Sequence, residues 1–309
     1  MGSYSLYYFY VIRKVYLNML ISVIIPMYNR KFTIKRAMNS VLSQVPNKKE
    51  FQIELIVVDD CSTDNSVEVA REIKDERVKI VKLDKNSGAN VARNYGINLA
   101  NGEIIAFNDS DDEWLPEKLS KQLEVLQEKN IDFLCCNMET DVYSGKMKML
   151  TPRPSGFVPI EELLGKNYIV STQNLIGKAD MFKSNQFSHE ISRFQDWELI
   201  LRLLIKGYRL YFMEEVLVRQ YIQPNSLSKN LKNGVLSLRY MLEEFKEEYA
   251  QHPLQKAEVI LTVGSHLHNM NYRCAQFYFK SLKLRFSMTV LAKALFMFFT
   301  DLSRKKESE

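Results

Sequence analysis

Three carboxylates crowd the positions from Asp109 to Asp112, directly after the apolar run Ile104–Phe107. Neither face of this run carries polar side chains, which is typical of a strand buried on both sides in a parallel sheet. Carboxylates gathered at one strand end repel one another unless a cation, a proton or hydrogen-bond donors offset their charge. The Asp109-Ser110-Asp111 spacing suits a hard divalent cation, which takes one or two protein carboxylates and fills its shell with water and substrate phosphates.

A helix cap is the simpler explanation for one of these aspartates. Asp111 or Asp112 would cap the helix expected from Pro116 to Lys129, where a proline in the first turn is well tolerated. One cap accounts for one aspartate and not for three. The pattern therefore favours a ligand site.

A second apolar run ends in the same way. Ile53–Val58 is followed by Asp59 and Asp60, and the β-branched run Ile21–Tyr28 comes before it. Apolar residues at helical spacing separate the expected strands. This alternation predicts an α/β fold with a parallel, doubly wound sheet, and ligands of such sheets bind at the carboxyl ends of the strands.

The chain is expected to be helical from Gly234 to its end, after one more helix and two strand-like segments. Asp196–Lys206 has a helical pattern, in which Glu198 and Arg202 have the spacing of a solvated ion pair. Two strand-like segments follow, at Arg209–Phe212 and Val216–Ile222. We expect an N-terminal extension over 1–18, an α/β domain over 19–230 and a helical C-terminal region over 231–309.

The two ends of the chain leave alternatives open. The apolar stretch Tyr4–Ile12 is too short to span a bilayer, so residues 1–18 are expected to be a loose extension, with a membrane anchor as the alternative. Near the C-terminus, Phe286–Phe299 is apolar but is interrupted by Lys293. An interfacial or partner-packing helix is expected there, and an ordinary terminal helix packed on its own domain is equally compatible.

The composition excludes several classes of protein. The chain has 309 residues, 46% of them apolar and 26% charged, as in soluble globular proteins. Its net charge of +5 suits anionic partners such as nucleotide sugars or acidic lipids, and no motif indicates nucleic acid. The four cysteines have neither metal-ligand nor disulfide spacing, which favours a reducing cytoplasm. Phosphate-loop, dinucleotide-binding and His-Glu-x-x-His motifs are missing from the sequence.

Four stretches carry a family resemblance. They are, in order, ISVIIPMYNR, IVVDDCSTDNS, NSGANVARNYGINLANGEIIAFNDSDDEWLPEKL and FQDWELILRLLIKGYRL. Together they resemble the family 2 glycosyltransferases of the GT-A fold, over roughly residues 19 to 228. The resemblance implies a doubly wound, mostly parallel nucleotide-binding sheet, followed by a helical C-terminal extension.

The resemblance also implies roles for the strand-end residues. Asp109-Ser110-Asp111 matches the family's Asp-x-Asp motif, so Asp109 and Asp111 are expected to bind Mn²⁺ or Mg²⁺, with Asp109 nearer the sugar or ribose. The other matched residues are expected to bind the nucleotide sugar: Pro26 and Tyr28 beside the nucleoside, Asp60 with Asp59 at the base, and Arg93 in the pocket. A helix cap for Asp60 and a surface salt bridge for Arg93 are the structural alternatives.

By the same resemblance, Asp196 is the general base. It would take the proton of an acceptor hydroxyl as that oxygen attacks the anomeric carbon, with inversion, while the metal stabilises the departing diphosphate. The alternative is that Asp196 caps its own helix. Three residues depart from the family pattern: Gln195 stands for a glutamate, Cys61 for a common glycine, and Gln223 for a histidine of many relatives.

The expected function is an inverting, metal-dependent glycosyltransferase. Its donor would be a nucleotide-diphosphate sugar, with uracil as the base, and its acceptor a saccharide or a lipid-linked saccharide of bacterial surface polysaccharide assembly. It would be cytoplasmic, with peripheral contact at the inner membrane face through its basic C-terminus. A Gln-x-x-Arg-Trp signature is missing after the Asp196 helix, so one sugar is expected per encounter.

Two alternatives to this function stay open. A nucleotidyltransferase would also carry strand-end aspartates, but its glycine-rich basic loop after the first strand is missing. A non-catalytic nucleotide-sugar-binding or scaffold protein at the membrane surface would use Asp196 only as a cap.

Overall fold

The computed structural model describes residues 19–46, 51–142, 146–149, 155–168, 171–222 and 230–304. The expected extension over 1–18 and the loop at Gln223 lie outside these ranges. Two compact units divide the chain: residues 1–157, 171–187 and 207–222 form the first, and residues 158–170, 188–206 and 223–309 form the second. Segments of the two units therefore alternate along the chain. Compactness does not test whether residues 19–230 fold independently. The domain boundary expected at residue 230 therefore stays a prediction.

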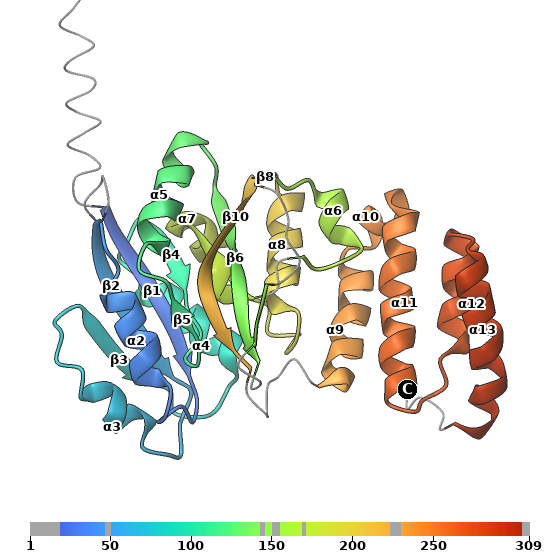
Figure 1. Cartoon of the computed structure of the whole chain (residues 1–309), viewed down its shortest axis with the longest axis horizontal. Coiled ribbons are helices and arrows are strands. Elements are labelled where there is room, and N and C mark those ends of the chain that lie inside the picture. The colour runs from blue at the N-terminus through green and yellow to red at the C-terminus, as the bar shows by residue number, and fades with distance from the viewer. Residues whose placement is uncertain are drawn as a thin grey trace, which may run out of the picture. The chain divides into compact units, whose positions relative to one another are not determined.

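Four parallel strands form one half of the sheet in the first unit, in the order β3-β2-β1-β4 (Figure 1). They are β1 (Met19–Met27), β2 (Phe51–Asp59), β3 (Val78–Lys82) and β4 (Ile104–Phe107), and they are connected by α2 (Ile34–Leu42), α3 (Ser66–Arg71) and α4 (Ala89–Leu99). The chain runs from β1 outward to β3 and then returns to the other side of β1. This reversal is the doubly wound arrangement that the sequence predicts, and it creates the switch point where ligands bind.

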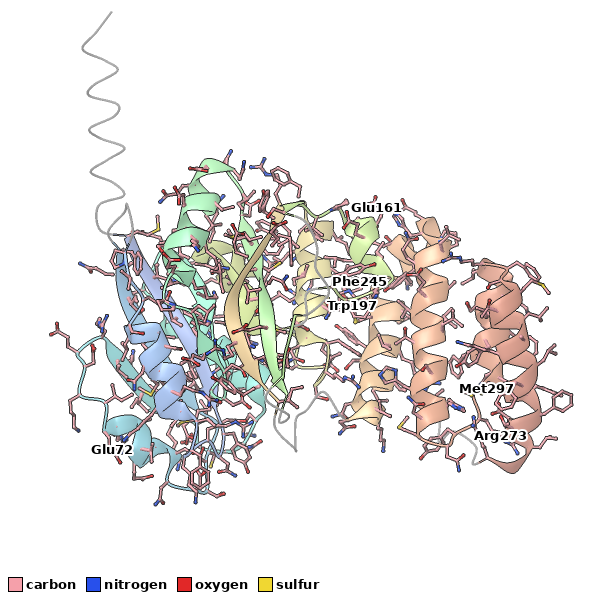
Figure 2. The ribbon with its side chains drawn as sticks, viewed as in Figure 1. Glu72, Glu161, Trp197, Phe245, Arg273 and Met297 are labelled. Carbon is pink, nitrogen blue, oxygen red and sulfur yellow. The ribbon has the colours of Figure 1, made fainter. Side chains whose placement is uncertain are left out.

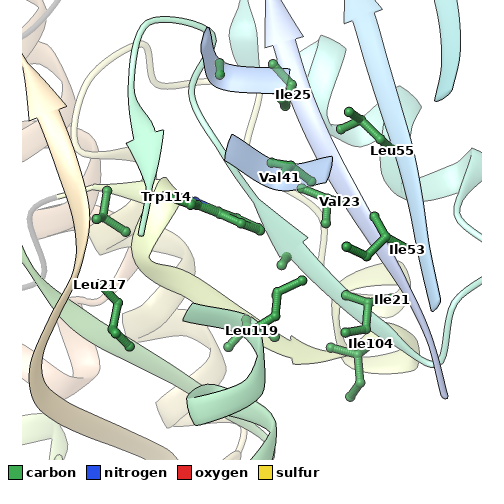
Figure 3. Close-up of a cluster of buried hydrophobic side chains, with 14 of the residues drawn as sticks. Ile21, Val23, Ile25, Val41, Ile53, Leu55, Ile104, Trp114, Leu119 and Leu217 are labelled. Carbon is green, nitrogen blue, oxygen red and sulfur yellow. The ribbon is translucent and has the colours of Figure 1, made fainter. Parts of the chain in front are cut away.

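Alternate residues of β1 face opposite sides of the sheet, as the pleat requires. Ile21, Val23 and Ile25 lie in the cluster of buried side chains that includes α2, α3 and α5 (Lys118–Glu128), shown in Figure 3. On the other side, a β-carbon at Gly96 of α4 would lie 2.5 Å from Cγ2 of Ile24. Helices therefore cover both faces, and α4 packs closely because position 96 has no side chain.

The other half of the sheet is mixed. β9 (Leu175–Lys178) runs antiparallel between β4 and β6 (Phe133–Val142), and β10 (Leu210–Tyr221) pairs in parallel with β6. Short antiparallel strands β5 (Glu113–Trp114), β7 (Lys146–Met149) and β8 (Gly156–Phe157) complete it, and α7 (Ala179–Ser184) follows β9. The two strands expected over 209–212 and 216–222 are one strand, β10, whose register shifts between Met213 and Val216.

The second unit is helical. Its helices are α6 (Ile160–Leu164), α8 (Gln195–Ile205), α9 (Leu231–Glu244), α10 (Lys246–Gln251), α11 (Pro253–Asn269), α12 (Ala275–Leu284) and α13 (Met288–Thr300). Figure 2 labels Trp197 and Phe245, two aromatic residues of its buried core. Nε1 of Trp197 donates to the carbonyl oxygen of Leu163 at 2.7 Å, which ties α8 to α6. Among the described residues, no helix combines the length and apolarity needed to cross a membrane.

Candidate active site

The carboxyl ends of β2, β1 and β4 lie side by side at one edge of the sheet. Backbone hydrogen bonds continue the ladder past the strands: the N–H of Asp60 donates to Met27 at 2.8 Å, and that of Asn108 to Ile24 at 3.1 Å. Tyr28, Asp60 and Asp109 therefore follow neighbouring strands. Pro26 is buried within β1, opposite Val58. This edge is where the sequence predicts the nucleotide site.

Asp60 accepts two backbone hydrogen bonds at the start of α4. The N–H groups of Ser87 and Gly88 donate to its Oδ1 and Oδ2, each at 2.7 Å. Gly88 precedes α4 with φ of +92°, a conformation that favours glycine. Asp60 therefore holds the two residues that lead into α4, and among the described residues it accepts no hydrogen bond from the N–H groups of the helix itself. Each carboxylate oxygen has two lone pairs, so Asp60 keeps acceptor capacity for a ligand.

Asp59 is completely buried and shapes the turn after β2. The N–H of Ser62 donates to its Oδ2 at 3.1 Å, and Nζ of Lys82 lies 3.9 Å from the same oxygen. Cys61, which lies in the turn from Asp59 to Ser62, has φ of +62°, in the left-handed region that favours glycine. Cys61, where a glycine is common in the family, therefore places a β-carbon in a backbone conformation that is strained for it.

Asp109 is held by an arginine from α4. Nη2 of Arg93 donates to its Oδ1 at 2.8 Å, and the hydroxyl of Ser171 donates to its Oδ2 at 3.4 Å. The Arg93 side chain is only 4% exposed and the Asp109 side chain is 23% exposed, so the surface salt bridge considered as an alternative is wrong: the pair is buried on its arginine side. Nε and Nη1 of Arg93 have no hydrogen-bond partner among the described residues.

Asp111 lies between two arginines. Nε of Arg30 is 3.5 Å from its Oδ2, and Nη2 of Arg36 donates to its backbone carbonyl oxygen. Burial raises the pKa of Asp111, and the nearby charge of Asp109 raises it further, against the lowering effect of Arg30. The carboxylates of Asp109 and Asp111 thus repel each other in a partly dehydrated site, where a cation would stabilise both.

Asp112 has a structural role. The backbone N–H of Tyr221 donates to its Oδ1 at 2.7 Å, which fixes the end of β10 beside the acidic cluster. Burial raises the pKa of Asp112 well above its ordinary value, and the charges of Asp111 and Asp109 add to this. Neither Asp111 nor Asp112 caps α5, because that helix begins after Glu117.

Sequence reasoning predicted Arg93 but missed Arg30 and Arg36, the two arginines beside Asp111. The guanidinium of Arg36 stacks on the ring of Tyr221, 3.6 Å from its centroid, and the hydroxyl of Tyr221 donates to Glu113 at 2.7 Å. Arg30 lies three residues after the end of β1, so the sequence could have indicated its place at this edge of the sheet. Arg36 lies on α2, 75 positions from Asp111, and only the fold brings the two residues together.

The donor set fits a divalent cation that is shared with a ligand. Within the described ranges, no three His, Cys, Asp or Glu side chains are arranged to hold a metal ion on their own. Mg²⁺ and Mn²⁺ at nucleotide sites take one or two carboxylates and substrate phosphates. Asp109 and Asp111, two carboxylates whose charges act on each other, match that set.

Asp196 lies in the second unit, as the second residue of α8. The residue in the N-cap position is Phe194, with φ of +61°. Asp196 is therefore not the N-cap residue of α8, and the cap alternative is wrong. Asp196 is buried, and its Oδ1 accepts from the N–H of Trp197 at 2.8 Å. A carboxylate in the first turn of a helix is stabilised by the helix dipole.

The ion pair expected to be solvated on α8 is buried. Glu198 is 1% exposed, and Arg202 binds it through two hydrogen bonds, from Nε at 2.8 Å and Nη2 at 3.2 Å. The expected spacing is confirmed and the expected exposure is wrong.

The sequence of this chain matches a known family and several relatives. The model of glycosyl transferase family 2 matches residues 22–185. TuaG of Bacillus subtilis, which is named for teichuronic acid biosynthesis, is 36% identical over 218 residues, 68% of this chain and 82% of TuaG. WfgD of Escherichia coli, a UDP-Glc:alpha-D-GlcNAc-diphosphoundecaprenol beta-1,3-glucosyltransferase, is 39% identical over 120 residues, 39% of this chain and 46% of WfgD.

Solved structures show the same fold. S. aureus TarS in complex with UDP-GlcNAc has a TM-score of 0.65 at 20% identity, over 92% of this chain and 91% of that one. The mannosyltransferase PcManGT from Pyrobaculum calidifontis, in complex with GDP-Man and Mn²⁺, has a TM-score of 0.59 at 16% identity, over 96% and 88%. The predicted GT-A fold with C-terminal helices is thus confirmed. From the family match and the relatives together, this chain belongs to glycosyl transferase family 2 and is a glycosyltransferase.

Proposed function

We propose that this glycosyltransferase moves one sugar from a UDP-sugar to a hydroxyl of a lipid-linked saccharide, with inversion, during bacterial surface polysaccharide assembly. The observation that carries the proposal is the pairing of strand-end carboxylates with arginines at one sheet edge. Asp109 and Asp111 supply negative charge for a cation, and Arg30, Arg36 and Arg93 supply donors for a diphosphate.

The arginines support an anionic ligand because their hydrogen bonds are incomplete. Nε of Arg30, Nε of Arg36, and both Nε and Nη1 of Arg93 are buried and have no hydrogen-bond partner in the described part of the chain. A buried donor without an acceptor is costly. Oxygens of a diphosphate would accept these hydrogen bonds, and guanidinium groups bind such oxygens well.

The nucleoside would lie at the ends of β1 and β2. Tyr28 is 40% exposed just after β1 and offers a face for stacking, and Pro26 lies two residues before it in the strand. Asp60 would accept from the imide N–H of uracil with the lone pairs left free by Ser87 and Gly88. Asp59 would keep Asp60 in place through the turn that it stabilises.

Asp109 and Asp111 would hold Mn²⁺ or Mg²⁺ together with the donor diphosphate. When bound, the ion would act as a Lewis acid that stabilises the charge of the departing diphosphate. Arg93 orients Asp109 for this task, and Arg30 and Arg36 hold Asp111 from its side chain and its backbone. The site would therefore be arranged before the donor binds.

Asp196 would act as the general base. It would remove the proton of the acceptor hydroxyl as that oxygen attacks the anomeric carbon from the face opposite the diphosphate, which inverts the configuration. The residue directly before it, Gln195, is neutral, so the base has no carboxylate as its immediate neighbour on that side of the chain.

The names of relatives support the acceptor class. TuaG is named for teichuronic acid biosynthesis, and WfgD for transfer to a diphosphoundecaprenol-linked saccharide. An acceptor of this kind is held in a membrane, so we propose that the enzyme works at the inner membrane face.

The test measures UDP release from UDP-glucose, UDP-galactose and UDP-N-acetylglucosamine, with a short-chain lipid diphosphate saccharide as acceptor and with manganese present. Asp196→Asn is expected to lower turnover by about 10²–10⁴-fold with UDP affinity unchanged. Asp180→Asn is the control, because Asp180 is an exposed carboxylate in the first turn of α7. Full turnover in Asp196→Asn would contradict the base assignment. UDP binding without turnover by the wild type would favour the non-catalytic binding or scaffold protein.

A further inference from the structure

Helix α13 exposes an apolar face. Met288, Ala292, Leu295 and Phe299 recur at the spacing of one helical stripe, and Phe296 lies beside them. Met288, Phe296 and Phe299 are exposed by 70%, 62% and 69%. We call these five residues the α13 face.

The opposite side of α13 is packed within its own unit. Ala294 and Met297 are buried, and Nη1 of Arg304 lies 3.8 Å from the sulfur of Met297. The N-terminal end of the helix is fixed by Ser287, whose hydroxyl accepts from the N–H of Val290. The α13 face is therefore held outward by packing on its back. Phe286 and Leu302, exposed by 70% and 75%, extend the apolar surface beyond both ends of the helix.

The chain around this face is strongly basic. Residues 270–304 contain six lysines and arginines and one acidic residue, Asp301, so this segment alone carries a net charge of +5. Arg285 pairs with Glu258 at 3.2 Å, and Arg304 lies 3.7 Å from Asp301. Exposed Lys283 and Lys293 have no acidic partner among the described residues.

We propose that the α13 face inserts into an anionic lipid surface, with Lys283 and Lys293 bound to its headgroups. Exposed phenylalanine and leucine beside lysine are typical of helices that lie in the membrane interface. Negative lipids complement the charge of residues 270–304, and they attract basic side chains within a Debye length. The inference rests on the proposed function in one respect: the acceptor of that reaction is itself held in a lipid membrane.

The charge argues against a second copy of this chain on the same face. Two α13 faces in contact would bring two segments of net charge +5 together, and like charges around an apolar contact oppose association. A lipid surface of opposite sign has no such penalty.

The test is sedimentation of the full chain with vesicles of phosphatidylcholine, alone or mixed with phosphatidylglycerol. Phe296→Ser with Phe299→Ser is the test variant, and Leu236→Ser with Leu254→Ser is the matched control, because these leucines are 54% and 51% exposed on α9 and α11. The test variant is expected to lower partitioning to the mixed vesicles about tenfold for each phenylalanine, and the control to leave it unchanged. Lys283→Gln with Lys293→Gln is expected to weaken binding to the mixed vesicles alone.

Three results would overturn the inference. They are equal partitioning of the wild type and the phenylalanine variant, equal loss in the leucine control, or self-association that the phenylalanine variant abolishes without any vesicle binding. The last result would assign the face to a second copy. UDP affinity is measured on the same samples. Vesicle binding without UDP binding would contradict the proposed function and leave the inference standing.

Discussion

Nη2 of Arg93, on α4, lies 2.8 Å from Oδ1 of Asp109, at the end of β4, and this pair is buried on its arginine side. The hydrogen bond fixes the first carboxylate of the Asp-x-Asp sequence. Two further donor atoms of the same guanidinium, Nε and Nη1, are buried and have no acceptor within the described residues. The pair thus links the proposed metal site to the proposed diphosphate site.

Replacing Arg93 by lysine is expected to weaken UDP binding by about 10–100-fold. Lysine keeps the charge but loses the fork of donors, and a hydrogen bond to a charged group contributes about 1.5–3 kcal/mol. Titration calorimetry with UDP and manganese measures the change. Arg77→Lys is the control, because Arg77 forms an ion pair with Asp75 in the same unit, away from the acidic cluster. Equal UDP affinity in Arg93→Lys and in the control would contradict a role for Arg93 in the nucleotide pocket.

Cys61→Gly is expected to raise the free energy of unfolding by up to about 1.5 kcal/mol. The left-handed conformation of Cys61 costs about 1–2 kcal/mol, which glycine avoids, while the freedom of glycine in the unfolded chain takes back about 0.5–1 kcal/mol. Urea unfolding of the wild type and the variant measures the difference. Cys61→Ala keeps the β-carbon and is expected to give no gain. A loss of stability in Cys61→Gly would show that the turn is not strained.

The sequence predicted the gathering of acids because parallel topology determines where strand ends lie. Asp60 and Asp109 follow apolar runs, and neighbouring parallel strands bring such ends to one edge. The sequence did not predict the contacts of Arg36, because no local spacing relates α2 to a loop 75 positions away.

Helical spacing also left burial undetermined. The separation of Glu198 and Arg202 predicts that they meet, but not which side of α8 faces the core of its unit, and Glu198 is buried. The antiparallel β9 was not predicted because its direction depends on pairing with β4 and β6, which are distant in sequence.

Lys118 is expected to make stability depend on pH. It is fully buried on α5, where Nζ donates to Oε1 of Gln122 at 2.6 Å, and burial lowers its pKa to about 8. In the unfolded chain the pKa of a lysine is about 10.4. Between these two values the unfolded chain binds more protons, so the contribution of Lys118 to stability rises with pH, by at most about 1.4 kcal/mol for each pH unit.

Lys118→Met is the variant that isolates this effect. Its advantage in unfolding free energy over the wild type is expected to shrink as the pH rises through 8 toward the pKa of an unfolded lysine. Lys121→Met is the control on the same helix, because Lys121 is only half-buried and pairs with Glu117. A difference between Lys118→Met and the wild type that stays constant with pH would show that Lys118 keeps an ordinary pKa.

The central claim is a site that binds a nucleoside diphosphate together with a divalent cation. Thermal stability of the purified chain with UDP, GDP, CDP or ADP, each with and without manganese, tests it most directly. We predict a rise in Tm with UDP that requires manganese and disappears in Asp111→Ala, while Asp84→Ala, in the loop after β3, retains it. No rise with any nucleotide, or an equal rise in Asp111→Ala, would contradict the account.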